Sequence, residues 1–238
     1  GTCLPDTNWI DDNREGLTIC DATSAAFCVD LPWEKLDVTA FSWQKGLGSE
    51  AAHGVLILSP KAVERLQTYT PPWPIPRLFR LTRQGELIEG IFRGETINTP
   101  SMMCVEDCLQ SLEWCESVGG LNSLLRRCQN NFLKIKEWID RTEWADFMAI
   151  DLSITSPVSV CFVLSALKQH DVSVQRDFLK SLAARLRHEQ VAYDIVNHMH
   201  APPSLRIWCG PTVNSEDIGL LLPWIEWAYH ETLKEFNS

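Results

Sequence analysis

Three short apolar runs in the first part of the chain most limit what this sequence can fold into. They occupy residues 17–20, 38–41 and 54–58, and each is bounded by polar residues, Gly or Pro. Short apolar runs without strict alternation are typical of strands that are covered on both faces of an α/β sheet. We therefore predict three neighbouring buried strands. A short helix is expected at 61–68 and an exposed loop at 70–76, where prolines remove backbone donors.

The rest of the chain predicts two helices and then a compact α+β unit. The expected elements are a helix at 101–118, a helix at 121–141, a strand at 159–164, a helix at 174–188, a strand at 205–209 and a helix at 215–236 interrupted near Pro223. The apolar residues spaced for a buried face on the first helix are Met102, Val105, Leu109, Leu112 and Cys115. We place a domain boundary between residues 120 and 140.

Charge and cysteine usage argue against several classes of protein. The chain has 31 acidic residues against 21 Lys and Arg, a formal net charge of −10, whereas binding to nucleic acid or an anionic membrane requires a basic face. The apolar runs fall far short of the roughly 18 residues that a membrane span needs. Nine cysteines without a CxxC pair indicate reduced thiols in the cytosol rather than a disulfide framework or a zinc site.

Two polar residues follow the first two predicted strands. Asp21 comes directly after residues 17–20, and Lys45 follows residues 38–41 after three intervening residues. Open α/β sheets collect ligands at the carboxyl ends of their strands. A lysine amine there can form a Schiff base with pyridoxal phosphate, and a carboxylate can keep the pyridine nitrogen of this cofactor protonated. One Asp and one Lys at strand ends are also common in sheets, so this pattern alone leaves a structural role open.

Longer stretches of the sequence make the comparison more specific. They are Cys-Asp-Ala-Thr-Ser-Ala-Ala-Phe at 20–27, Phe-Ser-Trp-Gln-Lys at 41–45, Gly-Ser-Glu-Ala-Ala-His-Gly at 48–54, Tyr-Thr-Pro-Pro-Trp at 69–73, Gly-Glu-Thr-Ile-Asn-Thr-Pro-Ser at 94–101 and Leu-Arg-Ile-Trp-Cys-Gly at 205–210. Together they resemble the phosphoserine aminotransferase family, in the branch typical of alphaproteobacteria and some archaea. The resemblance covers essentially the whole chain. It implies an α/β protein of the pyridoxal phosphate-dependent transferase fold type I. Residues 1–125 would be the C-terminal part of the large, mostly parallel-sheet cofactor domain, and 126–238 the small C-terminal α+β domain.

The resemblance also assigns roles to residues around the cofactor. Lys45 matches the catalytic lysine of the Schiff base, and Asp21 matches the partner of the pyridine nitrogen. Gln44 matches a contact to the cofactor phosphate. Asn98 and Thr99 match a pair that reaches across a homodimer to the phosphate of the neighbouring subunit's cofactor. Taken alone, this pair is also typical of a turn that leads into a helix.

The substrate residues follow from the same resemblance, with one departure. Arg206 matches the arginine that binds the α-carboxylate of the substrate, although an exposed strand arginine would look the same in sequence. His198 and His200 fall where the family has a His-Arg pair for the substrate phosphate, and the arginine of that pair is missing here. No third ligand lies near these two histidines in the sequence, so we expect no metal. His53 is expected to be a structural histidine with its hydrogen bonds satisfied.

The activity implied is transamination between glutamate and 3-phosphohydroxypyruvate, giving phosphoserine and 2-oxoglutarate for serine biosynthesis in the cytoplasm. The missing arginine leaves another pyridoxal phosphate-dependent transamination open, of the alanine–glyoxylate or serine–pyruvate type. In this family the lysine lies past the middle of the chain. We therefore expect this sequence to be a fragment, or one chain of a split enzyme that is inert without a separate N-terminal chain.

Overall fold

The computed structural model describes residues 1–236, and it divides the chain into two compact units. The lysine unit, named for Lys45, consists of Asp6–Ala26 and Asp30–Ser117. The C-terminal unit consists of Gly1–Pro5, Phe27–Val29 and the chain from Val118 onward.

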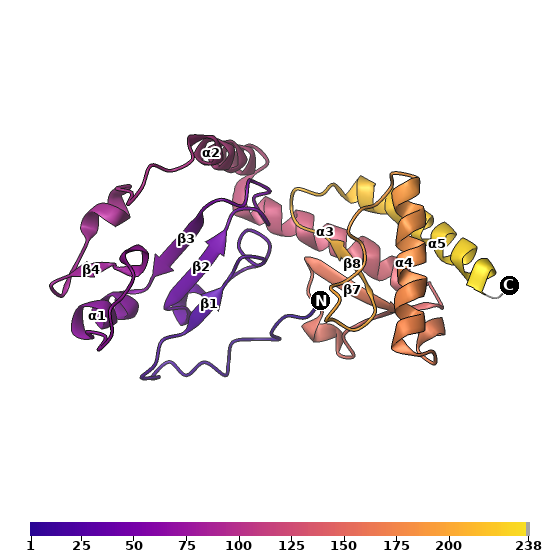
Figure 1. Cartoon of the computed structure of the whole chain (residues 1–238), viewed down its shortest axis with the longest axis horizontal. Coiled ribbons are helices and arrows are strands. Elements are labelled where there is room, and N and C mark those ends of the chain that lie inside the picture. Colours follow the sequence, from indigo (N-terminus) through magenta and orange to yellow (C-terminus); the bar gives the residue numbers. More distant parts are fainter. Residues whose placement is uncertain (237–238) are drawn as a thin grey trace. The chain divides into compact units, whose positions relative to one another are not determined.

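The lysine unit contains the three predicted strands, which form one sheet in the order β1-β2-β3 (Figure 1). These are β1 (Ile19–Asp21), β2 (Val38–Ser42) and β3 (Gly54–Leu58). β1 runs parallel to β2, with Asp21 opposite Ala40, and β3 runs antiparallel to β2. The prediction of three neighbouring strands is confirmed.

The predicted burial of these strands is wrong for the residues that the structure describes. Ile19 is 74% exposed, and Leu56 and Ile57 are also exposed. The same holds for the predicted buried face of α2 (Met102–Ser117), where Leu109 is exposed and the buried residues are Cys108 and Cys115. An apolar pattern marks side chains that favour burial, but it does not show which element, if any, covers them.

The other elements of the lysine unit are short; η1 precedes β2, and the rest follow β3 along the chain. They are η1 (Trp33–Lys35), α1 (Pro60–Thr68), η2 (Arg77–Phe79), β4 (Thr82–Arg83), β5 (Glu86–Leu87) and η3 (Glu89–Arg93). Ser59 caps α1, because its hydroxyl accepts the backbone N–H of Ala62 at 3.2 Å. The predicted helix at 61–68 and the exposed proline loop at 70–76 are confirmed.

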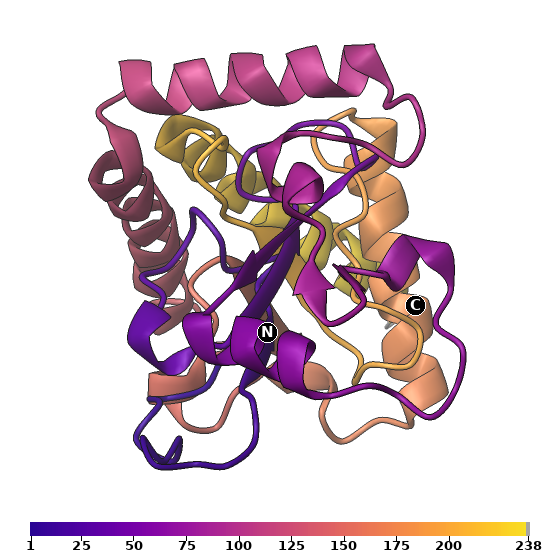
Figure 2. The same ribbon diagram turned by 90° about the vertical axis from the view of Figure 1, so that its left-hand side faces the viewer.

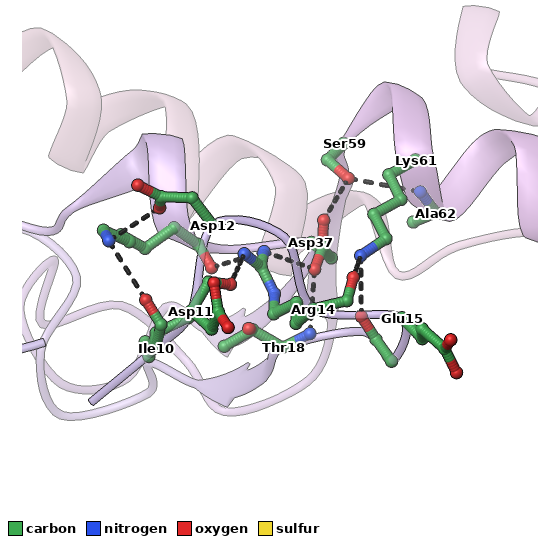
Figure 3. A network of polar contacts seen from close by, with 12 residues as sticks. Ile10, Asp11, Asp12, Arg14, Glu15, Thr18, Asp37, Ser59, Lys61 and Ala62 are labelled. Carbon is green, nitrogen blue, oxygen red and sulfur yellow. Dashed lines mark hydrogen bonds and ion pairs between the residues drawn. The ribbon is translucent and has the colours of Figure 1, made fainter. Parts of the chain in front are cut away.

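One buried carboxylate ties the ends of the sheet together (Figure 3). Asp37, which is 4% exposed, directly precedes β2. Its Oδ2 accepts the backbone N–H of Thr18 at 2.8 Å and an Arg14 guanidinium N–H at 2.6 Å, and its Oδ1 accepts the Ser59 hydroxyl at 2.8 Å. Burial raises the pKa of Asp37, but these hydrogen bonds and the Arg14 charge outweigh burial, and the net pKa lies below the usual range. Asp37 therefore holds segments before β1, before β2 and after β3 in one ionised cluster.

The C-terminal unit is an antiparallel sheet in the order β6-β7-β8, packed with three long helices (Figures 1 and 2). The strands are β6 (Ala145–Phe147), β7 (Ser159–Leu164) and β8 (Leu205–Trp208), and the helices are α3 (Gly120–Asp140), α4 (Val172–His188) and α5 (Ser215–Phe236), with the short turns η4 (Leu152–Ile154) and η5 (Ser165–Leu167). The core is centred on Trp138, Phe162 and Phe178, all fully buried. The helices and two of the strands are confirmed, whereas β6 was not predicted.

The expected interruption near Pro223 is also wrong, because α5 continues through this residue. A proline inside a helix removes one backbone donor and clashes with the preceding turn. Leu222 and Ile225, on either side of Pro223, are both buried in the core. We attribute the continuity of α5 to this packing.

The cysteines are free thiols, and most of them are buried. On α2, Cys115 is buried as predicted, Cys108 is also buried, and Cys104 is half-buried. Among residues 1–236, no helix is long and apolar enough to cross a membrane. The same part of the chain has no cluster of three His, Cys, Asp or Glu side chains suited to a metal ion.

We predict that Asp37→Asn lowers the free energy of unfolding by about 2–3 kcal/mol at neutral pH, because Arg14 keeps its charge but loses its ionic partner. Urea denaturation measures the change. Asp12→Asn is the control, since Asp12 pairs with Lys35 at the surface and such pairs contribute about 0–1 kcal/mol.

The pH dependence has a definite sign. The pKa of Asp37 is lower in the folded than in the unfolded chain, so its stabilisation is complete above the unfolded value of about 3.9 and is lost as the pH falls through the folded value. The difference in stability between wild type and Asp37→Asn should therefore shrink on acidification. A difference that stays constant from neutral pH to pH values below that range would contradict this account.

Candidate active site

The parallel pairing of β1 and β2 brings Asp21 and the Lys45 loop to one edge of the sheet. Asp21 is the last residue of β1, and β2 ends at Ser42, three residues before Lys45. Since the two strands run in the same direction, their carboxyl ends meet at the same edge. This is the edge at which α/β sheets bind ligands.

Hydrogen bonds from Thr23 keep the Asp21 side chain ionised. The backbone N–H of Thr23 donates to Asp21 Oδ1 at 3.0 Å, and the Thr23 hydroxyl donates to the same oxygen at 2.5 Å. These hydrogen bonds hold the pKa of Asp21 below its usual range, and the small effect of burial does not offset them. At neutral pH the side chain is therefore negatively charged, as a partner for a protonated ring nitrogen must be.

The loop that carries Lys45 is fixed to α2. Ser49 Oγ lies 2.7 Å from Ser111 Oγ, and the backbone N–H of Glu50 donates to Asp107 Oδ2 at 2.6 Å. The loop also closes on itself, because the N–H of Ser49 donates to the carbonyl of Trp43 at 3.1 Å. Lys45 lies inside this closed loop and is half-buried.

The same loop has unmet hydrogen-bonding capacity. Within residues 1–236, the buried atoms Trp43 Nε1, Gln44 Oε1 and His53 Nε2 have no hydrogen-bond partner. The rings of Trp43 and His53 meet edge to face at 5.6 Å. The expectation that His53 is fully satisfied is wrong, since its Nε2 is buried without a partner. Buried polar atoms are almost always paired in native proteins, so this group around Lys45 is suited to a polar ligand.

Asn98 and Thr99 lie in the irregular segment between η3 and α2, and both are exposed. In the described part of the chain their side chains make no hydrogen bond. Their donors and acceptors are therefore accessible from outside the lysine unit.

Arg206 and His198 come together in the C-terminal unit. Arg206 Nη1 lies 3.3 Å from His198 Nε2, and Arg206 Nη2 donates to Asp194 Oδ2 at 2.9 Å. His200 is exposed, and the structure gives it no contact with Arg206 in the described residues. Asp194 was not predicted, because no motif or spacing relates it to Arg206. The Asp194 side chain is 85% exposed, so another carboxylate could replace it on the Arg206 guanidinium.

A comparison with protein-family models gives no match. Among curated proteins, the phosphoserine aminotransferase of Methanosarcina mazei is 51% identical over 229 residues, which are 96% of this chain and 60% of that protein. Along nearly its whole length, the chain is therefore similar to phosphoserine aminotransferases. It spans about 60% of the length of this relative.

Solved structures show which fold the chain shares. A pyridoxal phosphate-bound phosphoserine aminotransferase from Trichomonas vaginalis superposes with a TM-score of 0.67 at 16% identity, over 90% of this chain and 55% of that one. An alanine–glyoxylate aminotransferase from Nostoc gives a TM-score of 0.66 at 16% identity, over 89% and 53%. The chain therefore has part of the fold type I aminotransferase fold, as the resemblance implied.

We predict that Thr23→Val raises the pKa of Asp21 toward the usual value of about 3.9, because the variant loses the hydroxyl donor and keeps the backbone donor. Titration of the side-chain carboxyl carbons by NMR measures this shift. Asp151, whose carboxylate accepts the backbone N–H of Ser153 at 2.8 Å, is the internal control and should titrate unchanged. An unaltered midpoint for Asp21 would show that the Thr23 hydroxyl does not hold its charge.

Proposed function

We propose that this chain forms part of a phosphoserine aminotransferase that transfers the amino group of glutamate to 3-phosphohydroxypyruvate, giving phosphoserine and 2-oxoglutarate in serine biosynthesis. The observation that carries the proposal is the placement of ionised Asp21 and Lys45 at the same edge of the β1–β2 pair. The 51% identity to the Methanosarcina mazei enzyme supports the choice of reaction.

The residues at this edge suit pyridoxal 5′-phosphate. Lys45 supplies an amine for the aldehyde, and Asp21 supplies a negative charge for the pyridine nitrogen. The side-chain NH2 of Gln44 can donate to the cofactor phosphate. The solved Trichomonas vaginalis relative is described as bound to this cofactor. When bound, the cofactor supplies an electron sink that stabilises negative charge at the substrate Cα.

The protein's own residues would then have separate tasks. Lys45 Nζ removes the proton from the substrate Cα as general base. Asp21 keeps a proton on the ring nitrogen, because its ionised carboxylate stabilises the protonated form. Arg206 binds the substrate α-carboxylate in a bidentate fork, replacing the Asp194 carboxylate that it contacts in this structure.

Domain assignment and assembly belong to the same proposal. Residues 1–125 would be part of the large cofactor domain and residues 126–238 the small domain. The exposure of Asn98 and Thr99 supports a homodimer in which this pair contacts the phosphate of the neighbouring subunit's cofactor. We place the enzyme in the cytoplasm because its nine cysteines are free thiols.

A second candidate is transamination of an unphosphorylated keto acid, of the alanine–glyoxylate type. It is favoured by the absence of an arginine next to His198 or His200 in the sequence. Comparing kcat/KM for 3-phosphohydroxypyruvate and for glyoxylate separates the two candidates.

The isolated chain should be assayed both alone and after addition of the preceding segment of a relative. Activity that appears only on addition would show that the chain needs a complementary segment.

We predict that pyridoxal 5′-phosphate, added to the chain and fixed by borohydride reduction, labels Lys45 in preference to other lysines. Peptide mass mapping locates the label. Lys45→Ala should lose it, whereas the control Lys136→Ala, which changes a half-buried lysine paired with Asp140, should retain it. Uniform labelling of surface lysines, unchanged in Lys45→Ala, would contradict the proposed cofactor site.

A further inference from the structure

The lysine unit contains a concavity lined by charged residues, which the roles assigned above do not use. It is a pocket of about 400 Å³ lined by Arg77, Arg80 and Arg83, with Thr82, Thr96 and Glu95 among the other lining residues. This volume lies within the range of small-molecule sites. Its remaining lining residues are isoleucines.

Local structure explains why the three arginines converge. Arg77 begins η2, and the chain then enters the β4–β5 hairpin, whose turn residues Gln84 and Gly85 have φ values of 55° and 84°. Positive φ at both positions is typical of a tight hairpin turn. The turn places Arg83 opposite Glu86 in the hairpin. The guanidinium of Arg80 is held in place because its Nε donates to the carbonyl of Ile75 at 2.7 Å.

The charge of the pocket is opposite to that of the chain. Three arginines and one glutamate give the lining a formal charge of +2, whereas the chain as a whole carries −10. Within residues 1–236, none of the three arginines forms an ion pair with an acidic side chain. By contrast, nearby Arg93 pairs with Glu89 at 2.5 Å. A concavity with this net positive charge is complementary to a dianion, and guanidinium groups bind phosphate through paired N–H donors.

We propose that this pocket binds the phosphate group of a small phosphorylated acid. The lining segment Glu95, Thr96 and Ile97 leads directly into Asn98 and Thr99, the pair proposed to reach the neighbouring subunit's cofactor. The arginines would thus bind the substrate phosphate of the neighbouring subunit, in place of the family arginine that is absent next to His198 and His200 in this sequence. The identity of the ligand rests on the proposed function, whereas phosphate binding by the pocket does not.

The experiment measures binding of phosphate compounds to the chain by ³¹P NMR line broadening and calorimetry at low ionic strength. The probes are O-phosphoserine, inorganic phosphate and pyridoxamine 5′-phosphate, with serine as the unphosphorylated control. We expect O-phosphoserine and inorganic phosphate to compete for one site, and serine not to bind there. Arg80→Gln should weaken both phosphate ligands about tenfold or more, a loss of about 1.4 kcal/mol or more, with smaller losses for Arg77→Gln and Arg83→Gln.

Arg93→Gln is the matched control, because it removes an arginine of the same unit that does not line the pocket and should leave the affinity unchanged. Lys45→Ala should also leave O-phosphoserine binding unchanged, so a failure of the cofactor site is distinguishable from a failure of this one. If Arg80→Gln weakens pyridoxamine 5′-phosphate but not O-phosphoserine, the pocket serves the cofactor and the substrate assignment is overturned. No phosphate binding, or binding that is equal in all variants, overturns the proposal.

Discussion

The buried carboxylate of Asp37 is the interaction on which the lysine unit most depends. It joins the segment before β1, the start of β2 and the residue that caps α1 after β3. A buried charge of this kind is stable only when its partners are all present, and here a guanidinium, a hydroxyl and a backbone N–H fill that role. The cluster lies at the end of the β1–β2 pair opposite to Asp21 and Lys45. It therefore fixes the register of the two strands and leaves their carboxyl ends, where Asp21 and Lys45 lie, unoccupied by the cluster.

At the carboxyl ends of β1 and β2, the structure has charged groups and buried polar atoms without hydrogen-bond partners. Thr23 keeps Asp21 ionised, and contacts to α2 hold the Lys45 loop. Trp43, Gln44 and His53 carry buried polar atoms without partners among the described residues. A chain of net charge −10 can still bind anionic groups where cations are concentrated, as they are in the arginine pocket. Local charge, rather than the total, decides which ligands such a protein attracts.

A short apolar run bounded by turn residues predicts a strand and its limits well in this chain. β3 and β7 match their predicted limits residue for residue, and both Asp21 and Lys45 were placed at strand ends. The sequence does not predict features that depend on which residues are neighbours in three dimensions. β6 has only three residues and no distinctive pattern, and the exposure of Leu109 depends on what packs against α2. The contact of Arg206 with Asp194 likewise joins residues that no motif connects, and Asp194 adopts a φ of 52°, which sequence does not predict for aspartate.

The proposed site requires that Asp21 contacts the ring nitrogen of the cofactor and that Lys45 bonds to the aldehyde at the opposite end of the same ring. The most direct test is the ¹⁵N NMR chemical shift of the ring nitrogen in ¹⁵N-labelled pyridoxal 5′-phosphate bound to the chain through Lys45. The account predicts the shift of a protonated nitrogen in the wild type and that of an unprotonated nitrogen in Asp21→Asn, with the cofactor still attached in both. An unprotonated nitrogen in the wild type, or a shift that does not change in Asp21→Asn, would contradict it.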